Sequence, residues 1–405
     1  MSHPRPHTEE AIALMMSFAD RTGLTSERPR QRYLWTDAFA VCNFLGLARA
    51  TGEHRYAELA LHLVDQVHHT LARHRGDDPR TGWISGLGER EGEVHPTRGG
   101  LRIGKGLPER GPDEPFDEQM EWDRDGQYFH YLTKWMHALD QVTRATGRPQ
   151  FNLWARELAG TAQRAFTYSP PAGAGPRRMY WKMSIDLTRP LVPAMGQHDP
   201  LDGYVTCVQL RATAARLPGG PGLEDETRQF AELLEGGEWA TTDPLGLGGL
   251  LIDASRLAQL PRQGDLPDQR LLGHLLTATL AGLQAYLEGG ELLLPAEHRL
   301  AFRELGLAIG LHAVESLWRA ADPECPVISP DVGASRQALM HYSPIGEAIE
   351  SFWRAAEHRQ GRAWSEHRDI DEVMLATSLA PDGFLTLLPA GALPGEAGQR
   401  PSGRS

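Results

Sequence analysis

Cysteine is scarce in this sequence. The 405 residues include three cysteines, Cys42, Cys207 and Cys325. This odd, sparse set excludes a disulfide framework, and the apolar runs around Cys42 and Cys207 are typical of small core residues. The sequence also lacks any apolar run of about 18 residues, the length that a membrane-spanning helix needs. Its mean hydropathy of −0.41 agrees with that absence.

Basic residues are in the minority, and the common metal-binding signatures are missing. The formal net charge of −12 gives no footprint for nucleic acid, although it leaves room for a locally basic cavity. No Cys-x-x-Cys pair or His-Glu-x-x-His motif occurs, so we expect neither a metal nor another cofactor. Residues 1–23 lack the apolar core and cleavage site of a signal peptide. We therefore expect a cytoplasmic protein.

The sequence does contain a repeated pair of helices. In the clearest copy, Tyr33–Arg75, a helix rich in small apolar residues is followed by an amphipathic helix with a charged face. Alternating strand patterns are almost absent. Twelve helices are expected, at Thr8–Thr22, Trp35–Thr51, His54–Arg75, Arg124–Thr146, Phe151–Tyr168, Asp202–Leu217, Glu224–Glu235, Leu245–Gln259, Asp268–Glu288, His298–Ala321, Pro344–Arg359 and Asp369–Ala380.

The small residues of alternate helices predict how the pairs are arranged. Glycine in a helix interior costs roughly 1 kcal/mol relative to alanine, so the several glycines in 245–260 and 304–317 indicate crowding that larger side chains cannot meet. Six hairpins closed into a ring, with the small-residue helices inside, would produce such crowding. An ordinary helical bundle with close crossings is the alternative. We predict an all-α fold, an (α/α)6 barrel formed by residues 1–390 as one domain, with a disordered tail at 391–405.

Three long segments interrupt the repeat, at 76–120, 169–200 and 322–343. Loops longer than about 12–15 residues are usually functional or disordered. These segments contain Trp, Tyr, His and paired charges, so we expect them to pack over the mouth of the ring, partly as short hairpins. The functional site is then expected at the ends where the inner helices begin.

The first candidate cluster heads the first inner helix and consists of Tyr33, Trp35 and Asp37. Trp35 offers a flat apolar face for a sugar ring, and Asp37 offers a carboxylate for hydroxyl groups. A role of Asp37 as a helix cap is the alternative.

The densest cluster is the run from Glu121 to Trp135, which leads into the second inner helix. Carboxylates held together in a pocket of low dielectric do not all ionise, so Asp123 is a candidate general acid. A favourable interaction with the helix dipole is the alternative reason for acids at this position. The candidate substrate contacts in this run are Glu121, Arg124, Tyr128, Tyr131 and Lys134.

Further polar groups lie near the starts of other inner helices. A satisfied core position or a surface position is the alternative for each of them. Arg102 and Lys105 belong to a Gly-rich loop that lacks P-loop spacing, and we expect this loop to form a basic lid over an anionic sugar. The remaining candidates are His198, Asp202 and Tyr204 at the third inner helix, His298, Arg299 and His312 at the fifth, and His367 and Arg368 at the last.

With these residues in view, the chain resembles the six-hairpin glycosidase superfamily of (α/α)6 toroids. The run Tyr33–Ala60 looks like the first hairpin of unsaturated glucuronyl and rhamnogalacturonyl hydrolases, in which an aromatic residue and an acid head the inner helix. Trp122, Arg124 and Tyr128 are similar to a Trp-x-Arg…aromatic motif of those enzymes. The neighbouring N-acylglucosamine 2-epimerases and aldose–ketose isomerases use two histidines that face each other across the funnel, with an arginine nearby. The residues that match this pattern are His298, Arg299, His312, His367 and Arg368.

These observations predict a carbohydrate-active enzyme, and first a glycoside hydrolase that acts on an anionic sugar. Asp123 would donate a proton to the leaving oxygen or to a double bond, and Asp37 would position water or a ring hydroxyl. The alternative is an epimerase or aldose–ketose isomerase with His298 or His312 and His367 as bases. A non-catalytic toroid that binds a glycan or a protein is a third reading. The expected partner is a sugar rather than nucleic acid or a membrane, and the oligomeric state stays open.

Overall fold

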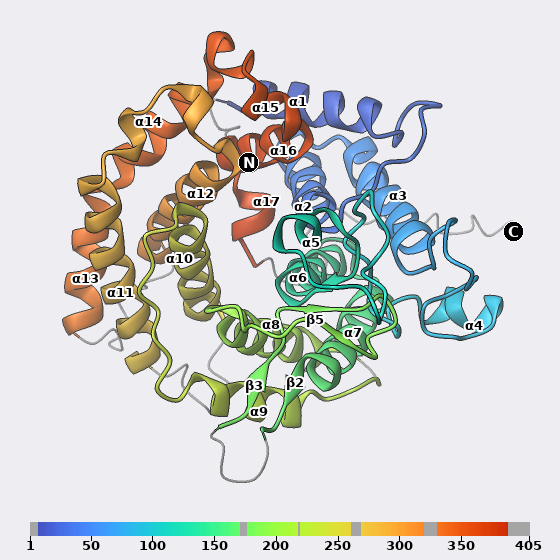
Figure 1. Ribbon diagram of the computed structural model, residues 1–405. Helices are drawn as coiled ribbons and strands as arrows, with labels where there is room; N and C mark the ends of the chain where they lie inside the picture. The colour runs from blue at the N-terminus through green and yellow to red at the C-terminus, as the bar shows by residue number, and fades with distance from the viewer. Residues whose placement is uncertain (1–6, 171–175, 218, 261–268, 320–329, 388–405) are drawn as a thin grey trace, which may run out of the picture.

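Figure 1 shows the computed structural model of the chain. Cys325 and the predicted tail at 391–405 lie outside the described residues. Within the described residues, none of the helices combines the length and the apolar character needed to cross a bilayer. The structure describes residues 7–170, 176–217, 219–260, 269–319 and 330–387.

Six helices form a closed inner ring (Figure 1). Each packs against the next around the ring, and the last packs against the first. This closure distinguishes the ring from an ordinary bundle with close crossings. The inner helices are α2 (Leu34–Thr51), α6 (Phe129–Thr146), α8 (Asp199–Ala214), α10 (Pro244–Gln259), α12 (Ala301–Arg319) and α16 (Arg368–Leu379).

Amphipathic helices surround this ring, and each contacts an inner helix. Their apolar stripes face the ring because that is the only way to bury them against another helix. The alternation confirms the predicted all-α (α/α)6 barrel. The outer helices are α1 (Thr8–Arg21), α3 (His54–Leu71), α7 (Gln150–Phe166), α9 (Glu224–Leu234), α11 (Gln269–Glu288) and α14 (Ser343–Arg354).

Glycines allow two inner helices, α10 and α12, to approach closely. A Cβ atom added at Gly248 would lie 2.0 Å from the backbone oxygen of Gly306. One added at Gly310 would lie 2.6 Å from the Cα of Gly248. No side chain fits at such distances, so these glycines set the spacing of the two helices. The small-residue pattern in the sequence therefore has the steric origin that we expected.

A short helix that the sequence analysis missed, α17 (Asp382–Leu385), lies inside the ring (Figure 1). Phe384 stacks on Phe39 of α2, with ring centroids 4.2 Å apart. The Nε2 atom of His137 lies 2.9 Å from the Phe384 carbonyl oxygen, and Gln141 donates a hydrogen bond to the Gly383 carbonyl oxygen. These contacts fill the half of the ring toward which the inner helices end.

Short strands and helices of the long connections lie over the other end of the ring and along its outer edge (Figure 1). A three-stranded antiparallel sheet has the order β1–β4–β5, with Tyr128 opposite Lys182. A second sheet pairs β2 with β3. The elements are α4 (Glu89–Val94), α5 (Glu118–Asp123), β1 (Gln127–Tyr128), β2 (Thr167–Tyr168), β3 (Arg178–Met179), β4 (Lys182–Met183) and β5 (Pro190–Val192).

Three predicted helix starts differ from the structure by three residues or more. The helix expected from Asp202 already begins at Asp199. The helix expected from Arg124 begins only at Phe129, because Arg124 is extended and Gly126 has a φ of +148° that favours glycine. The helix expected from His298 begins at Ala301, because His298 ends a separate 3-10 turn. The short turns of the chain are η1 (Glu291–Leu293), η2 (Ala296–His298), η3 (Ala356–Arg359) and α15 (Arg362–Glu366).

The third long connection also differs from its prediction. The described part of 322–343 forms α13 (Pro330–Met340). This helix packs against the outer helix α11 and not over the mouth of the ring. Its position on the outside separates this segment from the site described next.

Candidate active site

A cavity of about 1140 Å³ opens at the end of the ring where the inner helices begin. The first residues of α2, α6, α10, α12 and α16 contribute to its wall. Residues 102–105 of the first long connection, Trp122 of α5 and Trp181 next to β4 complete the rim. Helix starts from five inner helices therefore converge on one hollow.

Aromatic side chains form a continuous wall on one side of this cavity. The hydroxyl groups of Tyr33 and Tyr131 are 2.6 Å apart, and the Trp35 ring lies 5.3 Å from that of Tyr131. Tyr128 continues the wall to Trp181, with ring centroids 5.0 Å apart. Flat rings with hydroxyl groups at their edges match the alternating apolar faces and hydroxyls of a sugar.

Arginine and lysine outnumber acidic residues among the side chains that line the cavity, in contrast to the net charge of the chain. Opposite charges within one cavity partly cancel, but the excess of cations favours an anionic ligand. The lining contains seven cationic residues, Arg21, Arg30, Arg32, Arg102, Lys105, Arg303 and Arg368, against three acidic ones, Asp37, Glu366 and Asp369.

Several of these cations already have partners. Arg102 donates to the fully buried Asp125 at 2.6 Å, which ties the Gly-rich loop to the segment before β1. Lys105 contacts the carbonyl oxygen of Trp122, and burial lowers the pKa of its ammonium group. Arg30 and Arg368 are exposed at the rim, although Arg368 also forms an ion pair with Glu372 at 2.7 Å. The rim arginines are therefore better placed than Arg102 to meet a ligand anion.

Asp37 lies at the floor of the cavity and is 1% exposed. Its Oδ2 atom accepts a hydrogen bond from the Tyr33 backbone N–H, and Oδ1 lies 3.3 Å from Arg32 Nη1. Burial raises the pKa of this carboxyl to about 6, although Arg32 and the Tyr33 N–H oppose the shift. The bond to Tyr33 has the geometry of a helix-start cap, so Asp37 holds the first turn of α2 in place.

Two imidazoles line the cavity from different walls. His130 lies at the start of α6, with its ring 6.1 Å from that of Trp35. His367 directly precedes α16, with its ring 5.5 Å from that of Phe302. In the closed ring, α6 and α16 are the two neighbours of α2, so the imidazoles flank the Trp35 floor.

The structure brings half of the predicted site residues into this cavity. They come from four separate predicted groups, which explains why no single motif marked the site. The predicted residues that line the cavity are Tyr33, Trp35, Asp37, Arg102, Lys105, Tyr128, Tyr131, His367 and Arg368.

The acids of the densest predicted cluster lie outside the cavity lining. Asp123 is exposed at the end of α5. Glu121 is buried between Lys182, at 2.9 Å, and Arg110, at 3.0 Å. Arg124 forms an ion pair with Glu114. These residues hold the segment over the ring mouth. Asp123 itself is not part of the cavity lining, although its charge acts on Lys105 at the rim.

The other predicted residues outside the lining have contacts of their own. Lys134 and Asp202 form a buried ion pair of 2.6 Å beneath the aromatic wall. Arg299 binds Glu304 at 2.6 Å, and His312 lies 2.7 Å from Glu350 of α14. The predicted residues absent from the lining are Glu121, Asp123, Arg124, Lys134, His198, Asp202, Tyr204, His298, Arg299 and His312.

Sequence reasoning missed His130 and Trp181 as cavity residues. His130 lies within the dense aromatic run, but a helix predicted from Arg124 gave it no special position. Trp181 lies next to β4, and only the pairing of β4 with β1 brings it beside Tyr128. Pairing between segments about 55 residues apart leaves no local signal.

Lys182 joins β4 to the segment around α5 at the rim of the cavity. Its substitution tests how much these contacts stabilise the protein. Its ammonium group is fully buried and donates to the Glu121 carboxylate and to the carbonyl oxygens of Glu121 and Arg124. Lys182→Met is expected to lower the free energy of unfolding by about 3–5 kcal/mol, because it leaves a buried carboxylate and carbonyls without this cation. Urea denaturation measures the change. The matched control Arg362→Met, at an exposed ion pair, should leave the midpoint unmoved, and an equally small shift for Lys182→Met would contradict the assignment.

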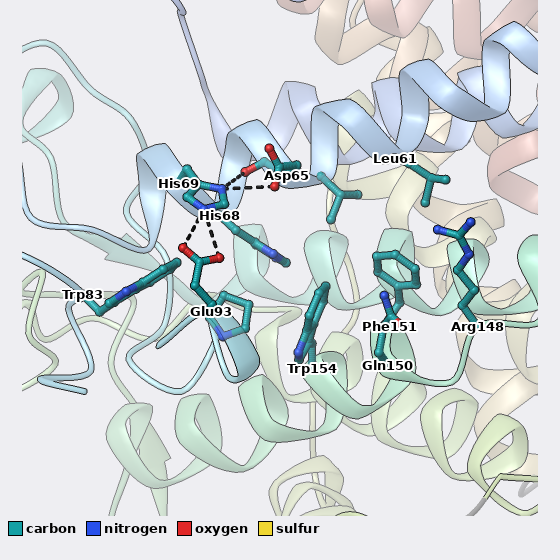
Figure 2. Close-up of a pocket in the computed structure, with 12 residues that line it drawn as sticks. Leu61, Asp65, His68, His69, Trp83, Glu93, Arg148, Gln150, Phe151 and Trp154 are labelled. Carbon is teal, nitrogen blue, oxygen red and sulfur yellow. Dashed lines mark hydrogen bonds and ion pairs between the residues drawn. The ribbon is translucent and has the colours of Figure 1, made fainter. Parts of the chain in front are cut away.

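Within the part of the chain that the structure describes, no three His, Cys, Asp or Glu side chains gather in a way that could hold a metal ion. A second, smaller cavity of about 200 Å³ lies on the outer side of the ring, between α3, α7 and the segment around α4 (Figure 2). Its polar groups bind one another: His69 Nε2 lies 3.0 Å from Glu93, and His69 Nδ1 lies 2.9 Å from the Asp65 carbonyl oxygen. Trp154 donates its N–H to the Val94 carbonyl oxygen. We therefore place the functional site at the ring mouth.

Comparisons with known proteins identify the fold. No family model matches the sequence, and no curated protein is similar to it. Among solved structures, a GH76 α-mannanase from Bacteroides thetaiotaomicron aligns with a TM-score of 0.53 at 8% identity, over 93% of this chain and 96% of that one. The cellobiose 2-epimerase of Spirochaeta thermophila (TM-score 0.47, 12% identity, 93% and 99% coverage) and a D-mannose isomerase (0.45, 12%, 83% and 85%) are less similar. At these identities the likeness shows the fold alone: this chain has an (α/α)6 toroid fold like that of the GH76 α-mannanase.

Proposed function

We propose that this chain is a carbohydrate-active enzyme that binds an anionic sugar in the cavity at the ring mouth. The aromatic wall from Tyr33 to Trp181 supports a sugar, because its rings can cover the apolar faces of a pyranose. The excess of arginine and lysine in the lining supports a carboxylate or phosphate on that sugar. The α-mannanase of the same fold acts on a carbohydrate, which agrees with this proposal.

The reaction that the geometry supports best is proton transfer next to a carbonyl group, as in aldose–ketose isomerisation or epimerisation. The observation that carries it is the pair of imidazoles, His130 and His367, in one cavity. One imidazole takes the proton from the carbon beside the carbonyl, and the C–H electron pair forms the C=C bond of an enediol. Return of a proton to the neighbouring carbon gives the isomer, and return to the opposite face gives the epimer. This pair replaces the predicted combinations of His367 with His298 or His312, since neither of those two lines the cavity.

Glycoside hydrolysis is the second candidate, and one observation favours it. Asp37 and Asp369 line the same cavity, and the charge of Asp369 contributes to the raised pKa of Asp37. Arg21 forms an ion pair of 2.7 Å with Asp369. One protonated and one ionised carboxyl are the pair that hydrolysis needs. We rank this reaction second because the Asp37 carboxylate already accepts the Tyr33 backbone N–H and so serves to hold the start of α2.

Proton exchange with solvent separates the two reactions. The chain is incubated in D₂O with uronates, sugar phosphates and neutral aldoses, and ¹H NMR follows the C2–H signal and the product. Isomerisation or epimerisation is expected to incorporate deuterium into an anionic sugar, and His130→Gln or His367→Gln should lower that rate by about 100-fold or more, the range for a lost acid or base. Asp37→Asn should reduce it far less.

Two controls complete this experiment. His341→Gln changes an exposed imidazole at the end of α13 and should leave the rate as it is. Release of a free sugar from aryl glycosides or oligosaccharides, without deuterium at C2, would overturn the isomerase in favour of the hydrolase. Binding of sugars without any turnover would overturn both and leave a glycan-binding toroid.

A further inference from the structure

His130 is held in a fixed orientation by the rings around it. The Tyr128 ring stacks on it at 5.3 Å with an angle of 27°, and the Tyr131 ring meets it edge-on at 4.9 Å. Trp35 and Trp181 each lie 6.1 Å from it. This aromatic enclosure prevents the imidazole from turning freely, so the two nitrogen atoms keep distinct surroundings.

The Nδ1 side of His130 faces a buried carboxyl group. The Oδ1 atom of Asp199, the first residue of α8, lies 3.7 Å from His130 Nδ1, and the Asp199 side chain is 6% exposed. This distance is longer than a hydrogen bond, so a small movement of either side chain has to complete the bond. Helices α6 and α8 are neighbours in the inner ring, so the contact joins two walls of the funnel. Nε2 is left as the nitrogen available to a ligand in the cavity.

The charges beneath the aromatic wall leave Asp199 without a cation of its own. Lys134 pairs with Asp202 at 2.6 Å, and Arg256 pairs with Asp253 of α10 at 3.0 Å. Asp202 lies close enough to Asp199 for its charge to disfavour a second carboxylate. A buried acid beside an ionised one keeps its proton unless a cation compensates it.

The titration of both groups agrees with this arrangement. Burial and the charge of Asp202 raise the pKa of Asp199 to about 8, although Lys134 and the Gly196 backbone oppose the shift. Burial lowers the pKa of His130 to about 4, with Asp202 opposing and Lys134 adding to the shift. Near neutral pH the acid therefore carries a proton and the imidazole is uncharged. The neighbouring His198 is partly buried, and this burial lowers its pKa.

We propose that Asp199, in its protonated form, is a positioning residue that donates to His130 Nδ1 and makes His130 the proton donor of the cavity, with His367 as the base. The proposal rests on the proposed function for its chemistry. His367 takes the proton from the sugar carbon, and His130 gives its Nε2 proton to the carbonyl oxygen. The Asp199 proton moves to Nδ1 as the Nε2–H bond breaks. In the second half of the isomerisation, His367 returns its proton to the neighbouring carbon, His130 Nε2 takes the proton of the other enediol hydroxyl, and the Nδ1 proton returns to Asp199. No proton or charge is left over.

An NMR experiment without substrate tests the contact itself. The full chain is labelled with ¹⁵N-histidine, and the His130 signals are identified by their loss in His130→Gln. Below about pH 7 the Nε2–H tautomer is expected, because Asp199 donates to Nδ1. As the pH rises through about 8, Asp199 ionises and becomes an acceptor, so the tautomer should change to Nδ1–H. An unchanged tautomer across this range in the wild type would overturn the proposal, whatever the enzyme turns over.

Variants extend the test to turnover. Asp199→Asn keeps a donor to Nδ1 but has no proton to give, so the tautomer should stay Nε2–H at all pH values. The kcat for deuterium exchange should fall about 100-fold with little change in KM, and the alkaline limb near pH 8 should disappear. The control variant His198→Gln changes a neighbouring, partly buried imidazole. It should keep both the tautomer change of His130 and the alkaline limb of the kcat–pH profile. Loss of the alkaline limb in His198→Gln but not in Asp199→Asn would contradict the role of Asp199. If the wild type shows no deuterium exchange, the proposed isomerase or epimerase function is refuted. The NMR tautomer measurement then still decides whether Asp199 donates to His130.

Discussion

Gly248→Ala is expected to lower the free energy of unfolding by about 3 kcal/mol, the upper part of the range for overpacked cores. The added methyl group would lie 2.0 Å from the backbone oxygen of Gly306. A backbone atom cannot move aside as a flexible side chain can, so α10 and α12 would have to separate. Because both helices belong to the closed ring, that separation would disturb their neighbours as well. Urea denaturation followed by circular dichroism measures the loss.

The chain offers a matched control for this change one residue away. A Cβ atom added at Gly249, also in α10, meets nothing within 4 Å. Gly249→Ala should therefore stabilise the protein by about 0.5–1 kcal/mol, since alanine favours the helix and restricts the unfolded chain. Equal losses for the two variants would show that helix propensity, and not the close approach of α10 and α12, explains the result.

The same glycines explain why the ring could be predicted from the sequence. Gly248, Gly306 and Gly310 lie in helix interiors, where only a close approach compensates their poor propensity. Gly52 and Gly147 adopt the left-handed conformation that ends a helix, at φ of +75° and +73°. Local chemistry of this kind determines where helices begin, end and touch. These local signals were sufficient to predict the fold and to predict at which end of the ring the cavity lies.

The site was less predictable, because its walls depend on long-range contacts. Tyr33, Trp35 and Asp37 could be found because they head an inner helix, where position alone brings them to the mouth. Asp123 looked equivalent in sequence, but the extended residues before α6 carry it to the surface. Only the fold shows that Asp199, a helix-start acid in sequence terms, faces His130 across two helices.

The second large effect concerns a buried acid at the start of α16. Asp371 is 1% exposed, and its Oδ1 atom accepts the Phe302 backbone N–H in the first turn of α12. Burial raises the pKa of this carboxyl to about 8; Glu372 adds to the shift and the Phe302 N–H opposes it. The folded-state pKa is above the unfolded value of about 3.9. The contribution of the protonated Asp371 carboxyl to the free energy of unfolding is therefore complete below about pH 4. This contribution is lost as the pH rises toward 8.

Asp371→Asn is expected to remove part of this pH dependence, because the amide keeps an acceptor for Phe302 but does not ionise. Between pH 5 and 8.5 the wild type should lose more stability than the variant, by an amount on the order of a few kcal/mol. Thermal unfolding across that range measures the difference, with Asp20→Asn on the exposed side of α1 as the control. Parallel curves for wild type and Asp371→Asn would contradict the assignment. If the difference is found, the buried Asp371 carboxyl, which joins the first turns of α12 and α16, makes the stability of the ring depend on pH.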